Sequence, residues 1–371
     1  MASFPEKLLN KLHEVKSQNK FRTLKTVYPT IDFSSNDYLG FSSSGVLQQH
    51  VASFTPSVNS GSTGSRLISG NSVLFNDTEH DIAQFHHAES ALIFNSGFDA
   101  NLGLLSSVPQ KGDLILSDEL IHASLIDGIR LSYATHYKFS HNNISQLKDL
   151  LERHHSSFNE IYIVVESVYS MDGDSAPLRE IIALSNHYHF HLIVDEAHAI
   201  GIFGEQGRGL CNELNIEDKC FARIYTYGKA MGCHGAAIVG SKQLKDYLIN
   251  FSRSFIYTTA LPEHSVVSIK KAYELLINSK EISRLKELIS YFNSQTQADN
   301  SFIKSNSAIH CKVVPGNTQV SELEQKLSAS NFFVKSIKSP TVKENQERLR
   351  ICLHSFNTFE EINQLLQLIA S

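Results

Sequence analysis

The sequence lacks several features that would each define a class of protein. No apolar run reaches the roughly 18 residues needed to span a bilayer, and the first residues, MASFPEK, contain no apolar core of a secretion signal. The five cysteines are scattered and include no CxxC pair, which argues against a disulfide framework. The net charge is −5 without any basic block, so nucleic acid is not an expected partner. We therefore expect a cytoplasmic protein with free thiols and no membrane partner.

What is present indicates a large globular chain. Its 371 residues are 42% hydrophobic and 19% charged, enough for one large domain and a smaller one. Seven short apolar runs, separated mostly by helical patterns, lie between residues 91 and 240. Such runs are typical of strands buried on both faces, so we predict an α/β fold with a mostly parallel seven-stranded sheet covered by helices on both faces.

The pattern changes near residue 261. A long helical segment, predicted over 264–294, leads to shorter mixed elements. We therefore expect an N-terminal helix or arm (residues 1–35), a large α/β domain (36–260) and a small C-terminal α+β domain (261–371).

Polar residues follow the apolar runs repeatedly. The predicted strand ends deliver Ser96 and Gly97, Asp118 with His122, Glu166 and Ser167, Asp195 with His198, and Thr226 with Lys229. Each pair alone is more often a turn, a helix cap or a surface residue. Ligands of open parallel sheets bind beyond the carboxyl ends of the strands, so the five pairs together predict one functional site there.

Pyridoxal 5′-phosphate (PLP) would give each of these groups a physical task. A buried Asp195 keeps the pyridine nitrogen protonated, and His198 orients that carboxylate or contacts the phenolic oxygen. Main-chain N–H groups of Ser96 and Gly97 at a helix start bind the phosphate, with the Thr226 hydroxyl. His122 stacks on the ring. Lys229 is the covalent partner of the cofactor and its proton shuttle.

Two other kinds of site, for a nucleotide and for a metal, are possible interpretations of short motifs in the chain. Residues 195–198 (DEAH) match a helicase nucleotide box, but the glycine-rich loop at 61–70 has no Gly-Lys-Ser/Thr, so no Walker A loop supports that interpretation. His187, His189 and His191 alternate, which would suit a metal. Their spacing fits no structural zinc site and no cysteine accompanies them, so exposed polar residues are the preferred interpretation.

Six motifs resemble those of the α-oxoamine synthases, which are fold-type I PLP-dependent transferases. They run in the family's order: 35–40 (SNDYLG), 95–98 (NSGF), 166–174 (ESVYSMDGD), 194–201 (VDEAHAIG), 226–232 (TYGKAMG) and 348–350 (RLR). The resemblance implies condensation of an amino acid with an acyl thioester and loss of CO2. It also implies a homodimer with shared active sites.

The resemblance assigns roles position by position. The implied catalytic residues are Lys229, His122 and Asp195. The implied cofactor contacts are Ser96, Gly97, Phe98, His122, Glu166, Ser167, Asp195, His198, Thr226 and Lys229, with Thr258 and Thr259 reaching the neighbouring subunit's phosphate. The implied substrate contacts are Arg350, which clamps the amino-acid carboxylate, Asn36, Thr341 and, as a candidate for the end of the acyl chain, Arg22. No metal is expected.

The chain departs from the family pattern in three places. Cys233 and His234 stand where small or apolar residues are usual, Glu263 follows Pro262 where a second proline is common, and the segment between Arg22 and Ile31 is short. Within the family, the short chain, the 61–71 loop and Thr341 favour L-alanine and a pimeloyl thioester, carried by CoA or a carrier protein, as substrates. Glycine with acetyl-CoA, and serine with a palmitoyl thioester, are the alternatives. A non-catalytic scaffold would not need Lys229 and Arg350.

Overall fold

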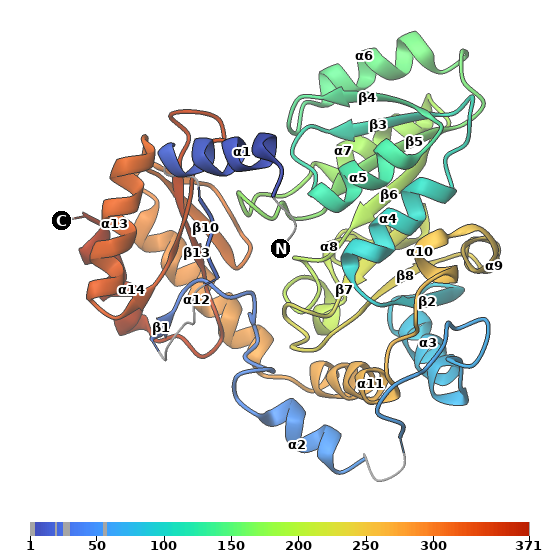
Figure 1. The fold of residues 1–371 in the computed structure, drawn as a ribbon, viewed down its shortest axis with the longest axis horizontal. Helices are drawn as coiled ribbons and strands as arrows, with labels where there is room; N and C mark the ends of the chain where they lie inside the picture. Colours follow the sequence, from blue (N-terminus) through green and yellow to red (C-terminus); the bar gives the residue numbers. More distant parts are fainter. Residues whose placement is uncertain (1–3, 19–20, 25–29, 55–57, 371) are drawn as a thin grey trace. The chain divides into compact units, whose positions relative to one another are not determined.

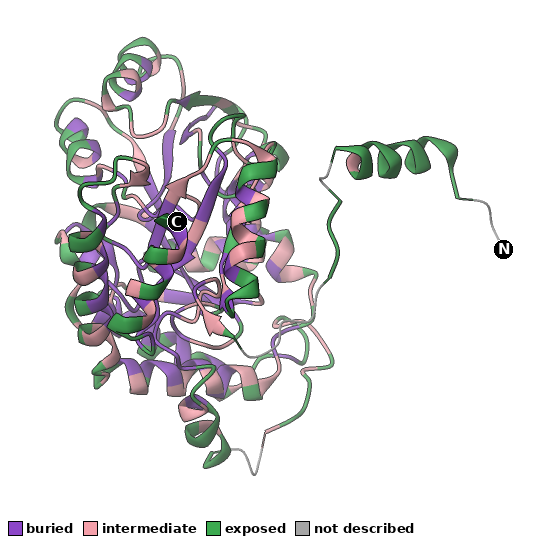
Figure 2. Cartoon of the chain, turned by 90° about the vertical axis from the view of Figure 1, so that its left-hand side faces the viewer, coloured by how far each residue is buried: buried purple, intermediate pink, exposed green. Residues whose placement is uncertain are grey.

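The computed structural model describes residues 4–18, 21–24, 30–54 and 58–370. The chain divides into two compact units, Met1–Ile31 and Asp32–Ser371. In the first unit, helix α1 (Glu6–Ser17) has no buried residue and is exposed along its length (Figure 2). The helix predicted near the N-terminus is present as α1. Its apolar face, which includes Leu8, Leu9 and Leu12, is about 40% exposed.

The second unit is built on a seven-stranded sheet of order β2-β8-β7-β6-β5-β3-β4 (Figure 1). Its strands are β2 (Ser90–Phe94), β3 (Leu114–Asp118), β4 (Thr135–Phe139), β5 (Ile161–Glu166), β6 (His191–Asp195), β7 (Cys220–Thr226) and β8 (Ala236–Gly240). Strand β8 runs antiparallel to both of its neighbours, and the remaining pairs are parallel. The predicted α/β fold with a mostly parallel seven-stranded sheet is confirmed.

The apolar runs form strands because both faces of the sheet are covered. All the residues of β3 and β5 are buried, and in β6 only His191, the first residue, is partly exposed. Branched and aromatic side chains at successive positions suit such a doubly covered strand. The edge strand β4 is mostly exposed instead, which fits its more polar sequence THYKF.

Helices of this unit connect and cover the strands. They are α2 (Val46–Ala52), α3 (Val73–Phe85), α4 (Gly97–Ser107), α5 (Ala123–Leu131), α6 (Ile144–His154), α7 (Leu178–Ala183), α8 (Leu210–Glu213), α9 (Lys242–Phe251), α10 (Arg253–Ile256) and α11 (Glu263–Ile277), with short 3-10 turns η2 (Leu184–Asn186), η3 (Glu205–Gly207) and η4 (Glu217–Lys219). Helix α4 packs against α5, β7 and β8. Ser96 caps α4 by accepting a hydrogen bond from the N–H of Asp99.

A second sheet forms from the C-terminal residues, with four strands in the order β12-β13-β10-β9. Its strands are β9 (Phe302–Ile303), β10 (Ile309–Val313), β12 (Lys335–Ile337) and β13 (Arg348–Cys352), accompanied by β11 (Phe332–Phe333), α12 (Glu281–Thr296), α13 (Asn317–Ala329) and α14 (Phe359–Ala370). The chain that follows β1 (Ile31–Asp32) joins this region, because Phe33 donates to the carbonyl of Phe333 and accepts from the N–H of Cys352.

The single long helix predicted over 264–294 is wrong. Two helices, α11 and α12, occupy that stretch. The hydroxyl of Ser279 between them accepts a hydrogen bond from the N–H of Glu281, which satisfies a donor at the start of α12. Helix α11 packs on α2 and α3 rather than on the C-terminal sheet. The division of the chain into domains at residues 35 and 260 remains a prediction.

A helix that crosses a membrane must be both long and apolar. Within the described part of the chain, no helix combines the length and the apolar character that crossing a membrane requires.

Candidate active site

A cavity of about 290 Å³ lies at the carboxyl ends of β5, β6 and β7. Loops after these strands and the first turns of α4 and α5 form its wall. The predicted site residues on this wall are Asn36, Ser96, Gly97, Phe98, His122, Glu166, Asp195, His198, Thr226 and Lys229. The sheet topology therefore gathers at one place residues that are far apart in the sequence, as the strand-end argument predicts.

Lys229 lies on the loop that follows β7. Its amine donates a hydrogen bond to Oγ1 of Thr226 over 3.4 Å. Burial lowers the pKa of Lys229, and the nearby Asp195 and Glu166 carboxylates offset part of that shift. A lysine with a lowered pKa is more readily deprotonated, which a nucleophile and a proton shuttle both require.

Asp195 is tied to His122 through two intermediate side chains. The amide nitrogen of Asn101 donates to Oδ2 of Asp195 over 2.8 Å and to Oγ of Ser124 over 3.0 Å. That hydroxyl lies 2.7 Å from Nδ1 of His122, which also accepts from the N–H of Ser124. Nδ1 of His122 is thus held as an acceptor. Burial lowers the pKa of His122, and its neutral form carries the proton on Nε2.

Glu166 is the second buried carboxyl group on the wall. Burial, together with repulsion from Asp195, raises the pKa of Glu166 to about 8. Oε2 accepts from the N–H of Ser170 over 3.2 Å, whereas Oε1 has no hydrogen-bond partner among the described residues. An unpaired buried oxygen costs free energy, so its position at the cavity indicates a partner supplied by a ligand.

His198 and Arg350 meet through Tyr38 and Asn36. The Tyr38 hydroxyl donates to Oδ1 of Asn36 over 3.0 Å and lies 2.8 Å from Nδ1 of His198. Arg350 donates from Nη2 to the same Oδ1 over 3.0 Å and from Nε to the carbonyl of Ser170 over 2.8 Å. Burial places the pKa of His198 well below its ordinary value, so its imidazole is neutral. The guanidinium of Arg350 is thereby fixed beside Asn36, a residue of the cavity wall.

The first turn of α4 supplies an anion-binding surface. The early N–H groups of a helix have no intrahelical partner, and the helix dipole is positive there. Ser96, Gly97 and Phe98 of this turn line the cavity. A Cβ on Gly97 would collide with Cγ2 of Thr226, so glycine is needed for the turn to approach β7 this closely.

Some predicted residues lie elsewhere. Ser167 is fully buried and is not on the wall; its hydroxyl and its N–H both donate to the carbonyl of Asp195. Thr258 and Thr259 bond Asn95, outside this cavity. Thr341 is exposed in the loop after β12. Arg22 belongs to the separate N-terminal unit. The cofactor and substrate contacts predicted for these residues stay predictions.

Three polar side chains that hydrogen-bond to residues of the site were not predicted from the sequence, and a fourth polar residue, on the cavity wall, was left without a role. Asn101, Ser124 and Tyr38 were not expected there, although a polar Asn101 one turn after Gly97 on an apolar helix was an available signal. Ser124 follows His122 by two residues, the spacing of a local cap. His234, noted as a departure from the family pattern, lines the cavity close to Lys229.

The residues present fit PLP. A lysine, a buried carboxylate, a neutral imidazole and the N-terminus of a helix are the groups that its aldehyde, pyridine nitrogen, ring and phosphate require. Glu166, whose Oε1 is unpaired among the described residues, and Gly97, which closely approaches Thr226, line the same cavity, as does Thr226 itself. The fold and the cavity together define a PLP-dependent transferase of fold-type I.

Comparison with known proteins agrees. The family model for aminotransferases of class I and II matches residues 28–369. The chain belongs to that family, and within it to the α-oxoamine synthases. It is 39% identical to an 8-amino-7-oxononanoate synthase of Emericella nidulans over 402 aligned residues, covering 100% of this chain and 97% of the relative.

Solved structures show the same likeness. The crystal structure of 8-amino-7-oxononanoate synthase from Francisella tularensis is 32% identical, with a TM-score of 0.80, over 92% of this chain and 97% of that one. A serine palmitoyltransferase from Sphingomonas wittichii is 26% identical, with a TM-score of 0.87, over 98% of this chain and 95% of that one.

Proposed function

We propose that this protein is an 8-amino-7-oxononanoate synthase of biotin synthesis, which joins L-alanine to the pimeloyl group of pimeloyl-CoA or a pimeloyl carrier protein and releases CO2. The observation that carries the proposal is the position of Lys229, which lines one cavity with Asp195 and lies near enough to Arg350 for the guanidinium charge to add to burial in lowering its pKa. The full-length identity of 39% to a protein of that name supports the choice among family members.

PLP, when bound, supplies an electron sink for the pair of electrons left at Cα of the amino acid. Asp195, held by Asn101, keeps a proton on the pyridine nitrogen. The first turn of α4 and Thr226 would hold the phosphate and His122 would contact the ring, since all of them line the cavity. Glu166, with a pKa of about 8, is protonated at neutral pH and donates a hydrogen bond from its carboxyl group.

Substrate binding falls to Arg350 and Asn36. The planar guanidinium binds the amino-acid carboxylate through two parallel hydrogen bonds. Lys229 removes the Cα proton and returns it to the product; burial lowers the pKa of Lys229, which favours the neutral amine that accepts a proton. His122 donates from Nε2 to the oxygen that becomes negative when Cα attacks the thioester. Thr341 and Arg22 extend the substrate contacts in this proposal.

The protein in this proposal is a cytoplasmic homodimer. Thr258 and Thr259, which lie beside Asn95 just before the phosphate-binding turn, reach the phosphate of the neighbouring subunit. Gel filtration with light scattering tests the dimer: a monomer that is fully active would contradict shared active sites.

The deciding experiment replaces the lysine and varies the substrates. We expect Lys229→Ala to abolish both turnover and the visible absorbance of the bound cofactor, while Lys242→Ala, a surface lysine paired with Asp246, changes neither. Wild-type enzyme is assayed with alanine, glycine or serine against pimeloyl-, acetyl- and palmitoyl-CoA. Preferred turnover of glycine with acetyl-CoA, or of serine with palmitoyl-CoA, would replace this proposal with the corresponding family member.

A further inference from the structure

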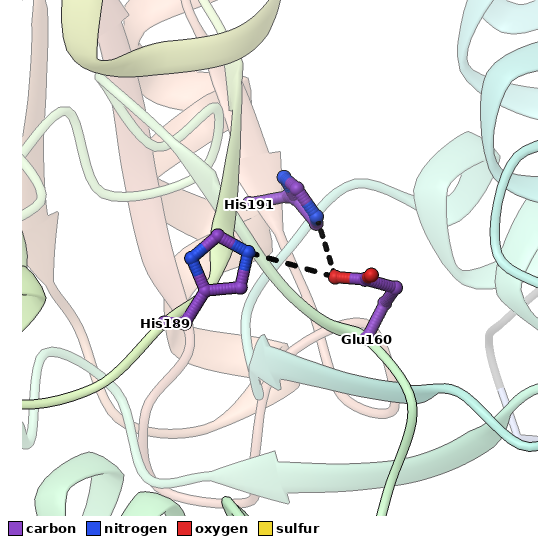
Figure 3. Close-up of side chains that lie close together, drawn as sticks. All are labelled: Glu160, His189 and His191. Atoms are coloured by element: carbon purple, nitrogen blue, oxygen red, sulfur yellow. Dashed lines mark hydrogen bonds and ion pairs between the residues drawn. The ribbon is translucent and has the colours of Figure 1, made fainter.

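Three side chains with metal-binding atoms meet at the edge of the central sheet opposite the cavity. Glu160, His189 and His191 each offer one ligand atom, and these atoms all lie within 4.8 Å of one another. Both imidazoles turn towards the carboxylate (Figure 3). Nε2 of His191 lies 2.8 Å and Nε2 of His189 lies 3.7 Å from Oε2 of Glu160.

Strand register produces this cluster. His189 and His191 are two residues apart, so an extended backbone places them on one face. In the parallel pair of β5 and β6, His191 lies beside Tyr162, and Glu160 is two positions before Tyr162. The carbonyl of Glu160 accepts from the N–H of Leu114 over 2.9 Å, which continues the ladder towards β3. Only His191 lies within a strand; Glu160 immediately precedes β5 and His189 lies two residues before β6, so the ligands come from two adjacent segments at the amino ends of these strands.

One of the imidazoles is fixed and the other can adjust. The His191 ring, only 24% exposed, packs against the rings of Tyr162 and Phe221, with centroids 5.1 and 5.0 Å away. The His189 side chain is 81% exposed and stands edge-on to His191, with centroids 5.2 Å apart. The His189 side chain can therefore move by the small distance that metal coordination requires, while His191 and the sheet stay in place.

The spacing suits a small divalent ion bound by nitrogen and oxygen. Ligands about 2.0–2.1 Å from a tetrahedral zinc ion lie roughly 3.3 Å from each other. The separations of 2.8 and 3.7 Å lie on either side of that value. Two imidazoles and a carboxylate favour Zn²⁺, Cu²⁺, Ni²⁺ or Co²⁺, whereas Mg²⁺ and Ca²⁺ prefer oxygen ligands throughout.

The structure contains another grouping of this kind, which is unsuitable. His141, Asp172 and Asp174 also lie close together. Both ring nitrogens of His141 already contact carboxylates, Asp118 on one side and Asp174 on the other, and Arg348 pairs with Asp172. A histidine that donates from both nitrogens is protonated and has no lone pair for a metal.

We propose that Glu160, His189 and His191 form a binding site for a divalent first-row transition metal, with its remaining coordination positions open to water. The interpretation of the alternating histidines as exposed polar residues omitted Glu160, because that carboxylate precedes a different strand, β5. A bound ion links the amino ends of β5 and β6, so its effect is on stability. It has no part in the reaction, and the proposal is independent of the proposed function.

The test titrates the holoenzyme, prepared without a polyhistidine tag, with Zn²⁺ by calorimetry. We expect one site per chain, a rise in Tm on binding, and no comparable binding of Mg²⁺. His189→Ala and Glu160→Gln should each weaken zinc binding about tenfold or more. His187→Ala is the matched control, because His187 is exposed and alternates with the pair but is not part of the cluster; it should bind zinc as wild type does.

Two results would overturn the proposal. One is wild-type zinc affinity in His189→Ala; the other is equal weakening in His187→Ala, which would mean nonspecific binding by surface histidines. His191→Ala also removes the packing on Tyr162 and Phe221, so His189→Ala carries the test if that variant folds poorly. Anomalous scattering at the zinc edge from soaked crystals should place the ion between the three side chains; a peak only at the cavity would contradict the assignment.

Discussion

The side-chain amide of Asn101 donates a hydrogen bond to Oδ2 of Asp195 over 2.8 Å, inside the sheet edge where both are buried. The other oxygen of Asp195 accepts from the N–H of Ala197 over 2.9 Å. The carboxylate is therefore oriented from two sides by groups of the protein itself. Such preorganisation lowers the cost of presenting a charge to a ligand.

Removal of this amide should weaken cofactor binding. We expect Asn101→Ala to raise the dissociation constant for PLP about tenfold, because a hydrogen bond to a charged group contributes roughly 1.5–3 kcal/mol. Absorbance titration of the apoenzyme measures it. Ser124→Ala removes the other contact of Asn101 and should have a smaller effect; equal PLP affinity in Asn101→Ala and wild type would contradict the role.

Gly97 and Thr226 are expected to depend on each other. In Gly97→Ala the new methyl group collides with Cγ2 of Thr226, so phosphate binding by the turn should be lost and PLP affinity should fall at least about tenfold. Thr226→Ser keeps the hydroxyl and removes that methyl group. We expect the double variant to recover most of the affinity, and additive losses in PLP titrations would show that the collision is not the cause.

Arg350 should act on the amino acid rather than on the cofactor. In Arg350→Lys the charge remains, but the planar pair of donors that Ser170 and Asn36 hold in place is lost. We expect KM for the amino acid to rise about tenfold or more, with PLP absorbance unchanged. Steady-state kinetics at saturating thioester separate the two effects. Loss of cofactor from this variant would contradict the assignment.

His141 should give a pH-dependent contribution to stability. Burial alone lowers the pKa of His141, but its hydrogen bonds to Asp118 and Asp174 raise it to about 10. In the unfolded chain the pKa of His141 is about 6.5. The stabilisation from the protonated imidazole is therefore complete below that pH and disappears as pH rises through about 10.

Urea unfolding of His141→Gln tests this. The variant should be less stable than wild type by about 2 kcal/mol at pH 6, with a smaller difference near pH 10. His155→Gln is the control, because the His155 ring contacts the backbone carbonyls of Leu151 and Glu152 and the ring of Tyr188; its difference from wild type should change little between the two pH values. A difference for His141→Gln that grows with pH would contradict the protonated pair.

The main sheet and much of the site could be predicted because strand composition and strand ends are local signals. The apolar runs that form β3 and β5 were among those predicted, and their polar ends located Asp118 and Glu166. The break between α11 and α12 was missed, since it spans only Asn278, Ser279 and Lys280, which include neither proline nor glycine.

Contacts across the fold were the part that sequence could not supply. Asn101 reaches Asp195 only because α4 packs against the sheet, and Tyr38 reaches His198 across 160 positions of sequence. Glu160 joins His189 through strand register alone. These pairs have no common motif, so only the assembled sheet makes them visible.

The strand order also determines at which stage of synthesis the cavity can form. Strand β2, which leads into the first turn of α4 at Ser96, lies at the sheet edge and pairs with β8. On a ribosome, β2 therefore emerges long before residues 236–240, and contacts between such distant segments form slowly. PLP should therefore bind during synthesis only after β8 has left the exit tunnel. Its binding would then follow the completion of the sheet and would not guide the early steps of folding.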